Sequence, residues 1–363
     1  MRIAVDVREL CGRRTGVGRY LGELLQEWTT NRDARRHEWH LYAHERPSVP
    51  SAYANGIHVI PGAGGTAWEQ WTLDRALTVA RPDVLFAPAY TAPLTAPCPV
   101  ALTIHDMSFS AHPEWFSWRE GMRRRLLTRW SARRARVVIT VSTFSKREIA
   151  THCGIPSDRI RVIGHGMRSW VAAPPRAREP LVLYVGSIFA RRNVATLLQA
   201  FLDTVAPALP DARLAIVGDN RTYPRVDLDT LLARAPEEIR RRVALHAYAS
   251  DDELAGLYAS ASAFVFLSEY EGFGFTPLEA LAAGVPPVVL DTPIAREIYG
   301  PAARYLPPFP DLSRAVGEAL VELLVAEAPR RDILRYAPEV LGRYLWDRAA
   351  ADTLRAIEDA AGV

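Results

Sequence analysis

Short apolar runs alternate with longer segments of helical periodicity through most of the chain. This alternation is typical of parallel β-sheets whose strands are connected by helices, so the expected fold class is α/β with doubly wound sheets. The apolar runs predict strands at residues 2–7, 37–44, 57–61, 83–88, 100–106, 136–142 and 159–166, and then at 181–187, 213–219, 243–249, 263–268 and 286–291. Helices are expected to begin near Gly18, Ala67, Ser117, Ser142 and Trp346.

The strand pattern is interrupted once, by a segment rich in proline and alanine at residues 169–180. It has no periodicity and reads as a linker. A chain of 363 residues is long for a single core, so two domains are expected. The predicted division is 1–170 and 171–340, followed by a terminal segment, 341–363.

The composition is that of a soluble globular protein, with 49% hydrophobic and 23% charged residues. No apolar run reaches the length of a membrane-spanning helix. A strand begins almost at the first residue, so no signal peptide is predicted. Cys11, Cys98 and Cys153 are too far apart for a disulfide framework or a zinc motif. A cytoplasmic location is therefore expected.

Charge is distributed unevenly along the chain. Residues 1–175 carry 24 Lys+Arg and 15 Asp+Glu (24 − 15 = +9), and the remainder carries 20 and 26 (20 − 26 = −6). Eight arginines lie within 119–136, interleaved with Trp118, Leu126 and Trp130. Such a helix could lie on an anionic membrane surface, or it could be a solvated helix whose apolar stripe packs on the sheet. No RNA-binding or DNA-binding motif accompanies it, so nucleic acid is not an expected partner.

The stretch EGFGFTPLE, from Glu271 to Glu279, follows an apolar strand and opens a short helix that ends at Gly284. Ligands of open α/β sheets bind at the carboxyl ends of strands. Backbone N–H groups at the start of such a helix suit a phosphate, and two carboxylates can hold hydroxyl groups of one polar ligand. The alternative is a solvated helix with two ordinary surface acids.

Three other segments carry candidate binding residues. Gly16 and Gly18 follow the first strand and open a helix, which fits either a phosphate cradle or a tight turn without a ligand. His105 and Asp106 end a strand, and His105 could contact a ligand or be an ordinary core histidine. The loop GSIFARRN at 186–193 supplies arginines that can fork onto phosphate oxygens, and its final Asn193 is a good helix N-cap.

These motifs together resemble the retaining glycosyltransferases of family 4, which have the GT-B fold. The resemblance rests on EGFG…LEA, on G-V-G-R-Y at 16–20, on IHDMSFSAHPEWF at 104–116 and on GSIFARRN. It is closest to the branch that includes the O-antigen mannosyltransferases. It implies two Rossmann-like domains that face an interdomain cleft, with the last helix crossing back to the first domain.

The resemblance also implies roles for individual residues. Glu271 would contact hydroxyls of the donor sugar, and Glu279 would hold the ribose of the nucleotide. Arg192 stands where the family has a lysine that neutralises the donor diphosphate, and His105 becomes a donor contact. The predicted catalytic residues are His105, Arg192 and Glu271. The predicted donor-binding residues are Gly16, Gly18, Asp106, Ser187, Arg191, Arg192, Gly272, Phe273, Gly274, Phe275, Thr276 and Glu279.

The expected function is a metal-independent, retaining transfer of a hexose from a sugar nucleotide, preferably GDP-mannose, to a glycan or lipid-linked saccharide. Fixed cations and a helix start would stabilise the departing diphosphate, and the sequence has no His/Cys cluster with ligand spacing. The expected cofactor is therefore none beyond the sugar nucleotide. Two alternatives are a nucleotide-sugar 2-epimerase of the same fold and a non-catalytic glycan- or nucleotide-binding module.

Overall fold

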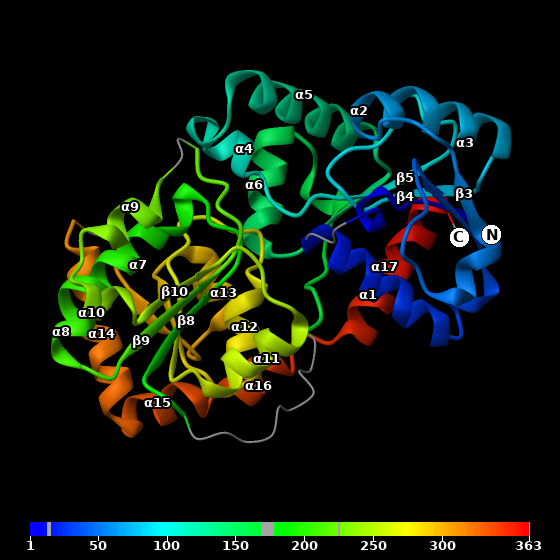
Figure 1. Cartoon of the computed structure of the whole chain (residues 1–363). Coiled ribbons are helices and arrows are strands. Elements are labelled where there is room, and N and C mark those ends of the chain that lie inside the picture. The colour runs from blue at the N-terminus through cyan, green and yellow to red at the C-terminus, as the bar shows by residue number, and fades with distance from the viewer. Residues whose placement is uncertain (13–15, 168–177, 224–225, 309, 363) are drawn as a thin grey trace. The chain divides into compact units, whose positions relative to one another are not determined.

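The computed structural model describes the whole chain except residues 13–15, 168–177, 224–225, 309 and 363 (Figure 1). The chain forms two compact units. Unit 1 comprises Met1–Gly166 and Tyr344–Val363, and unit 2 comprises Met167–Arg343. Most of the predicted linker, 169–180, lies outside the described residues.

Unit 1 contains a seven-stranded parallel sheet with the strand order β3-β2-β1-β4-β5-β6-β7. All seven predicted strands are confirmed, and each is shorter than its apolar run, most of all β7, which has three residues where 159–166 was predicted. They are β1 (Arg2–Asp6), β2 (Glu38–Ala43), β3 (Ile57–Val59), β4 (Val84–Ala87), β5 (Val100–Thr103), β6 (Val137–Thr140) and β7 (Ile160–Val162). The strands β1, β4, β5 and β6 are almost entirely buried, because helices cover both faces of the sheet.

The helices of unit 1 begin close to the predicted positions. They are η1 (Arg8–Leu10), α1 (Gly16–Thr30), η2 (Ala34–Arg36), η3 (Ser51–Gly56), α2 (Gly65–Ala67), η4 (Trp68–Leu73), α3 (Asp74–Ala80), α4 (Ser108–Ala111), η5 (Pro113–Trp115), α5 (Trp118–Arg134), α6 (Thr143–Cys153), η6 (Ser157–Arg159) and α17 (Trp346–Ala361). The helix start predicted near Ser142 is confirmed, and the Ser142 hydroxyl caps α6 by accepting a hydrogen bond from the backbone N–H of Ser145 at 3.0 Å. Within the described residues, no helix is both long enough and apolar enough to cross a bilayer.

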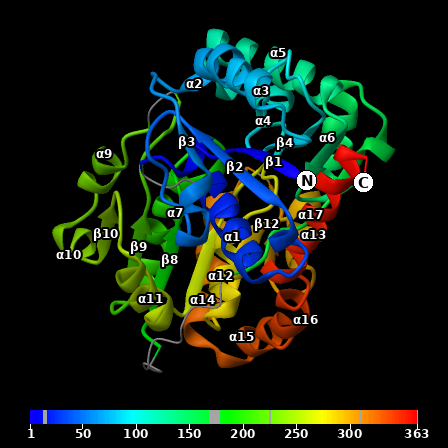
Figure 2. The same cartoon turned by 90° about the vertical axis from the view of Figure 1, so that its right-hand side faces the viewer.

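The last helix, α17, belongs to unit 1, as the fold prediction required. It packs on α1 and on strands β4 to β6, and Figures 1 and 2 both show the red helix beside the blue one. The indole N–H of Trp28 on α1 donates a 2.9 Å hydrogen bond to the carbonyl of Ala350 on α17. Leu354 and Ile357 turn inward and are 2% and 0% exposed. Residues from both ends of the chain therefore build one core.

Unit 2 contains a six-stranded parallel sheet with the order β10-β9-β8-β11-β12-β13. The strands are β8 (Leu181–Val185), β9 (Arg213–Val217), β10 (Val243–His246), β11 (Ala263–Phe266), β12 (Pro287–Leu290) and β13 (Arg304–Leu306). The first five were predicted. The edge strand β13 was not predicted, because its three residues lie in a short segment between Pro301 and Pro307 that has the composition of a loop.

The helices of unit 2 connect these strands on both faces of the sheet. They are η7 (Ala190–Arg192), α7 (Val194–Ala200), η8 (Phe201–Val205), α8 (Ala206–Ala208), α9 (Leu228–Ala233), α10 (Glu237–Arg240), α11 (Asp251–Ser260), α12 (Phe275–Ala282), α13 (Pro293–Tyr299), α14 (Leu312–Val325), α15 (Glu327–Leu334) and α16 (Ala337–Leu341). The predicted end of α12 is confirmed, since Gly284 follows it with a φ of +71° that suits a helix C-terminal glycine.

The strand order reverses between β8 and β11 in unit 2 and between β1 and β4 in unit 1. At such a switch point the two loops leaving the carboxyl ends of the strands run in opposite directions and leave room for a ligand. In unit 2 these are loop 186–193 after β8 and loop 267–274 after β11. We refer to them as the paired loops, because both contain predicted site residues.

Candidate active site

The centre of the paired loops is an ion pair between Arg192 and Glu271. The guanidinium Nε of Arg192 lies 2.7 Å from Oε1 of Glu271, and their side chains are only 14% and 15% exposed. Arg192 also donates from Nη1 to the carbonyl of Ser187 at 2.9 Å, and the Ser268 hydroxyl donates to Glu271 Oε1 at 2.9 Å. The structure thus brings together the predicted site residues Ser187, Arg192 and Glu271. The ion pair between Arg192 and Glu271 was not predicted.

Electrostatics keep both members of this pair charged. Burial by itself would raise the pKa of Glu271, but the charges of Arg192 and Arg191 outweigh burial and hold its pKa below the ordinary value. Burial would lower the pKa of Arg192, but the adjacent Glu271 carboxylate outweighs it and raises that pKa above its ordinary value. The site therefore contains a fixed, ionised acid and a fixed, ionised guanidinium at neutral pH.

The guanidinium groups of Arg191 and Arg192 make cation–π contacts with neighbouring aromatic rings. The guanidinium carbon of Arg192 lies 5.0 Å from the ring centre of Phe266 and 5.4 Å from that of Phe189. The guanidinium of Arg191 lies over the same Phe189 ring at 4.3 Å. Cation–π contacts of this kind hold a guanidinium in place without neutralising its charge. Two positive charges are thereby concentrated at the switch point of the sheet.

Asn193 joins the paired loops, although it was predicted to be a helix N-cap. It occupies the N-cap position of α7 with a φ of +51°, but its side chain makes no capping hydrogen bond. Its amide instead donates to the Leu267 carbonyl at 3.1 Å and to Glu269 Oε1 at 2.8 Å. The N-cap prediction for this side chain is therefore wrong, because neighbouring loop carbonyls compete for the amide.

The glycine turn before α12 is as tight as the sequence predicted. Gly274 has a φ of +87°, and a Cβ atom there would lie 2.2 Å from the hydroxyl oxygen of Tyr299. That hydroxyl donates to the Gly274 carbonyl at 3.1 Å. Phe275 and Thr276 form the first turn of α12, and the buried hydroxyl oxygen of Thr276 has no hydrogen-bond partner within the described residues. A buried polar atom without a partner costs about 1 to 3 kcal/mol, which a bound ligand can recover.

Glu279 lies on α12 and is 3% exposed. Its Oε2 atom accepts a hydrogen bond from the hydroxyl of Tyr258 on α11 at 3.1 Å. The family resemblance predicts that this carboxylate binds the ribose of the nucleotide. Its hydrogen bond with Tyr258 was not predicted. The predicted ribose contact therefore requires the carboxylate to bind a ligand from a position that is largely covered in this structure.

A small cavity of about 10 Å³ borders the paired loops. Glu271, Ser268 and Phe273 line it from loop 267–274, and Thr292 and Tyr299 line it from the β12–α13 connection and α13. The buried ring of Phe273 lies edge-to-face with Phe275 at 5.4 Å. Gly272, between Glu271 and Phe273, is also buried. A volume of this size holds one water molecule at most, so only a single polar group could enter here beside Glu271.

In unit 1, the predicted residues His105 and Asp106 follow β5 at the carboxyl edge of the sheet. His105 is 8% exposed, and its Nε2 atom is 2.8 Å from the Pro88 carbonyl. Asp106 accepts hydrogen bonds from the Tyr90 hydroxyl and from the Ser108 backbone N–H, each at 2.8 Å. Tyr90 adopts a φ of +66°, which is unusual for a residue other than glycine and marks a constrained loop.

A second histidine, His165, stacks on His105 with a ring separation of 5.5 Å. Tyr20 contacts both rings, at 5.0 Å and 4.8 Å. Burial lowers the pKa of both histidines, and for His165 the nearby His105 lowers it further. Both rings are consequently neutral at physiological pH. The sequence singled out His105 but not His165, which lies 60 residues away and becomes a neighbour only through the sheet.

The predicted glycines Gly16 and Gly18 lie in the first turn of α1. Gly18 is buried, and nothing lies within 4 Å of the position that a Cβ atom would take at Gly16. The residues immediately before them, 13–15, lie outside the described residues. The helix start after the first strand is confirmed, and the phosphate-binding role of its glycines stays a prediction.

An ionic network that was not predicted from the sequence lies at the end of β1. The guanidinium of Arg8 pairs with Asp6 at 2.6 Å and with Glu69 on η4. Glu69, which is 2% exposed, also accepts a hydrogen bond from the Thr91 hydroxyl at 2.7 Å. Burial raises the pKa of Glu69. Asp6 could have indicated this network from the sequence, because it is a carboxylate at the end of the strand beside the switch point.

Two protein families match this chain in its two halves. The family described as Glycosyltransferase Family 4 matches residues 14–168, and the family described as Glycosyl transferases group 1 matches residues 171–340. The matches meet at the boundary between the two units. The chain belongs to the family 4 glycosyltransferases. The resemblance inferred from EGFG…LEA and its companion motifs is confirmed.

Curated relatives of this glycosyltransferase include two O-antigen enzymes. The chain is 28% identical over 207 residues to O-antigen chain mannosyltransferase RfbU of Salmonella typhimurium, a match that covers 57% of this chain and 56% of that protein. It is 27% identical over 267 residues to O-antigen chain mannosyltransferase B of Escherichia coli, covering 70% and 68%. The match to the first relative thus spans little more than half of its length.

Among solved structures, this glycosyltransferase shares its fold with Anabaena Alr3699/HepE, determined in complex with UDP-glucose. The TM-score is 0.75 at 17% sequence identity, and the match covers 100% of both chains. WaaG, a glycosyltransferase involved in lipopolysaccharide biosynthesis, matches with a TM-score of 0.72 over 97% of this chain and 99% of the other. The predicted GT-B fold, with two Rossmann-like domains, is confirmed.

Proposed function

We propose that this protein transfers a hexose, with retention of anomeric configuration, from a sugar nucleotide to a glycan or lipid-linked saccharide. GDP-mannose is the preferred donor, because both O-antigen relatives are named mannosyltransferases. The proposed acceptor, a glycan or lipid-linked saccharide, is supported by the same two names, because both mention the O-antigen chain. A sugar nucleotide as co-substrate is also supported by the structural neighbour that was determined with UDP-glucose.

The observation that carries this proposal is the ion pair of Arg192 and Glu271 at the switch point of unit 2. Both hydrogen bonds to Glu271 go to its Oε1 atom, so Oε2 can accept from a sugar hydroxyl. Arg191, Arg192 and the backbone N–H groups of Phe275 and Thr276 supply positive potential for a diphosphate. The expected roles of Ser187 and Gly274 are to position these groups through their backbone carbonyls.

In the proposed reaction, the bond between the anomeric carbon and the diphosphate oxygen breaks while the acceptor oxygen bonds to the same face of that carbon. The departing diphosphate takes the acceptor proton, so no carboxylate has to act as base. Negative charge grows on the diphosphate, and the two arginines stabilise it. We propose that transfer is metal-independent on this account. His105, in unit 1, is proposed to contact the donor as a neutral hydrogen-bonding group.

We also propose that α5 holds the protein at an anionic membrane surface. Trp118, Leu126 and Trp130 are 73%, 39% and 46% exposed, although tryptophan is usually well buried. The exposed arginines 119, 123, 129 and 134 lie on the same outward side of the helix, while Gly121 and Ser131 face the protein. Aromatic rings beside arginines suit the interface of an acidic bilayer.

Transfer is tested by incubating the purified protein with GDP-mannose and a polyprenyl-diphosphate-linked saccharide, with UDP-glucose as an alternative donor. The expected product is the acceptor plus one hexose by mass, with the α configuration by NMR, at an undiminished rate in EDTA. A β-linked product would rule out retention, and loss of turnover in EDTA would rule out metal independence. Binding of nucleotides without transfer or donor hydrolysis would instead indicate a binding module.

Membrane binding is tested by co-sedimentation with vesicles containing anionic lipid at low salt. Replacing arginines 119, 123, 129 and 134 with glutamine should release the protein, since each arginine near the surface contributes about 1 kcal/mol. The matched control replaces four exposed arginines of unit 2, at positions 234, 241, 304 and 314, and should leave binding unchanged. Equal loss in both variants, or no binding by the wild type, contradicts the proposal.

A further inference from the structure

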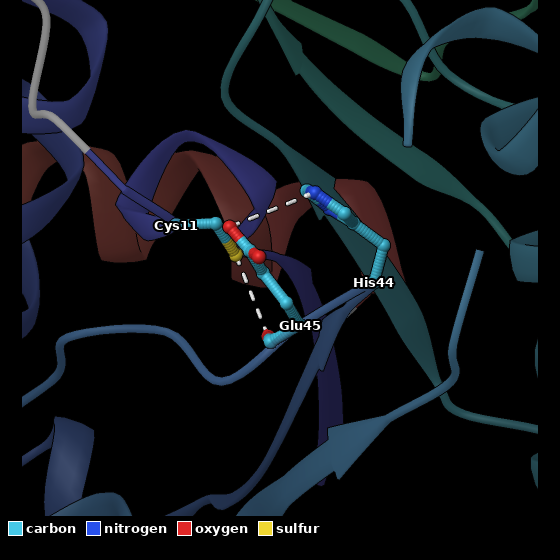
Figure 3. A group of neighbouring side chains, drawn as sticks. All are labelled: Cys11, His44 and Glu45. Atoms are coloured by element: carbon cyan, nitrogen blue, oxygen red, sulfur yellow. Dashed lines mark hydrogen bonds and ion pairs between the residues drawn. The ribbon is translucent and has the colours of Figure 1, made fainter. Parts of the chain in front are cut away.

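Cys11, His44 and Glu45 come together in unit 1 (Figure 3), and none of the three is assigned to transfer. Cys11 follows η1, and the other two residues follow β2, the neighbour of β1 in the sheet. The Cys11 Sγ atom, a His44 ring nitrogen and a Glu45 carboxylate oxygen all lie within 4.8 Å of one another. A thiol, an imidazole and a carboxylate are the three side-chain types that bind zinc in proteins.

The polar groups of this cluster do not satisfy one another. The His44 Nε2 atom is 3.9 Å from Glu45 Oε1, which is too long for a hydrogen bond. The Cys11 thiol reaches only the backbone carbonyl of Glu45, at 3.4 Å. Groups that face one another without bonding directly are what a shared central ligand would explain.

The spacing fits a metal better than it fits direct contact. Two nitrogen or oxygen ligands of a tetrahedral zinc ion lie roughly 3.3 to 3.6 Å apart, as bond lengths of about 2.0 to 2.3 Å require. The His44–Glu45 distance needs to shorten by only a few tenths of an ångström. Gly64 packs directly under the imidazole, where a Cβ atom would be 3.1 Å from Nε2, so the ring is held in this orientation.

The local charge also favours a cation. Glu45 and Asp6 both place negative charge near the Cys11 sulfur, and the nearby positive charge of Arg8 is engaged by Asp6 and Glu69. We propose that Cys11, His44 and Glu45 bind a zinc-type divalent transition-metal ion, with solvent completing the coordination. The ion clips the segment after β1 to the end of β2. It has no role in the transfer reaction.

The proposal is tested on the full-length protein, stripped with EDTA and exchanged into metal-free buffer, by titration with Co²⁺ as a spectroscopic probe and then with Zn²⁺ by calorimetry. The wild type should bind one ion and show a thiolate-to-cobalt charge-transfer absorption. Cys11→Ser should abolish that absorption, and His44→Gln and Glu45→Gln should each weaken binding at least tenfold. Cys98→Ser is the matched control and should behave as the wild type.

Circular dichroism and the transfer rate verify that each variant is folded. Charge-transfer absorption that persists in Cys11→Ser, or that is lost in Cys98→Ser, would place the ion at another cysteine and overturn the proposal. Failure of the wild type to bind either ion at ten times the protein concentration would overturn it as well. Because the transfer rate is expected to be equal with and without the ion, these outcomes leave the proposed transferase function untouched.

Discussion

At the scale of single residues, the role of Arg192 can be separated from its structural pairing. Arg192→Lys keeps the charge and supplies the residue type that the family resemblance implies at this position, so kcat should stay within about tenfold. Arg192→Gln removes the charge and should lower kcat by about 10² to 10³, the usual loss when one transition-state donor is removed. Steady-state kinetics with GDP-mannose measure both variants.

The Arg192→Gln variant also leaves Glu271 buried without its partner, which can cost about 3 to 5 kcal/mol of stability. A double variant, Arg192→Gln with Glu271→Gln, removes both charges and should regain most of that stability. It should not regain turnover. Recovery of turnover in the double variant would show that Arg192 acts only by balancing the charge of Glu271.

The Glu271 carboxylate makes stability depend on pH in a defined direction. Its pKa is lower in the folded protein than its ordinary value of 4.5, so its contribution is complete above that pH and is lost as pH falls through the folded pKa. The stability difference between wild type and Glu271→Gln should be constant from pH 7 to about 5.5 and should shrink below about pH 4.5. Urea unfolding at each pH measures it, and a difference that grows on acidification contradicts the assignment.

Position 274 requires glycine for two reasons, which are its positive φ and the closeness of the Tyr299 hydroxyl. Gly274→Ala should destabilise unit 2 by about 1 to 3 kcal/mol, since alanine is strained at a φ of +87° and its Cβ meets the Tyr299 hydroxyl. Adding Tyr299→Phe removes the clashing oxygen and should restore part of the loss. The control is Gly256→Ala on α11, where nothing lies within 4 Å, and there alanine should be neutral or stabilising. Urea unfolding measures all three.

At the scale of elements, α17 is the helix on which unit 1 depends. Its inward residue Leu354 is 2% exposed, so Leu354→Ala should cost about 2 to 5 kcal/mol through lost burial and the cavity left behind. Leu345, at the start of the same helix, is 50% exposed, and Leu345→Ala should change stability by less than about 0.5 kcal/mol. Similar losses in both variants would mean that α17 is not packed as described.

At the scale of the whole molecule, the two units have separate sheets and separate cores, so unfolding should occur in two transitions. Of the nine tryptophans, only Trp170 falls in unit 2. Tryptophan fluorescence therefore reports unit 1, and circular dichroism reports both units. Leu354→Ala should lower the fluorescence midpoint alone. GDP-mannose at 100 times its Kd should stabilise the unit 2 transition by about 2.7 kcal/mol, and coincident curves under all conditions would contradict this division.

The sequence by itself determined the elements and their order. Within the described residues, period-two and unbroken apolar runs located twelve of the thirteen strands, and serine and glycine positions marked helix ends at Ser142 and Gly284. The motif around Glu271, taken together with those at 16–20, 104–116 and 186–193, was sufficient to indicate the family. These features are local, because a strand, a cap or a turn is specified by residues within a few positions of one another.

Only the tertiary structure decided which of those residues touch. Arg192 and Glu271 are 79 positions apart, and they pair because β8 and β11 are neighbours in the sheet. Cys11 meets His44 and Glu45 in the same way, because β1 and β2 are neighbours, whereas Tyr258 meets Glu279 through the contact between helices α11 and α12. Side chains at the carboxyl ends of parallel strands meet according to the order of the strands. That order is set by how the helices pack, which local periodicity does not encode.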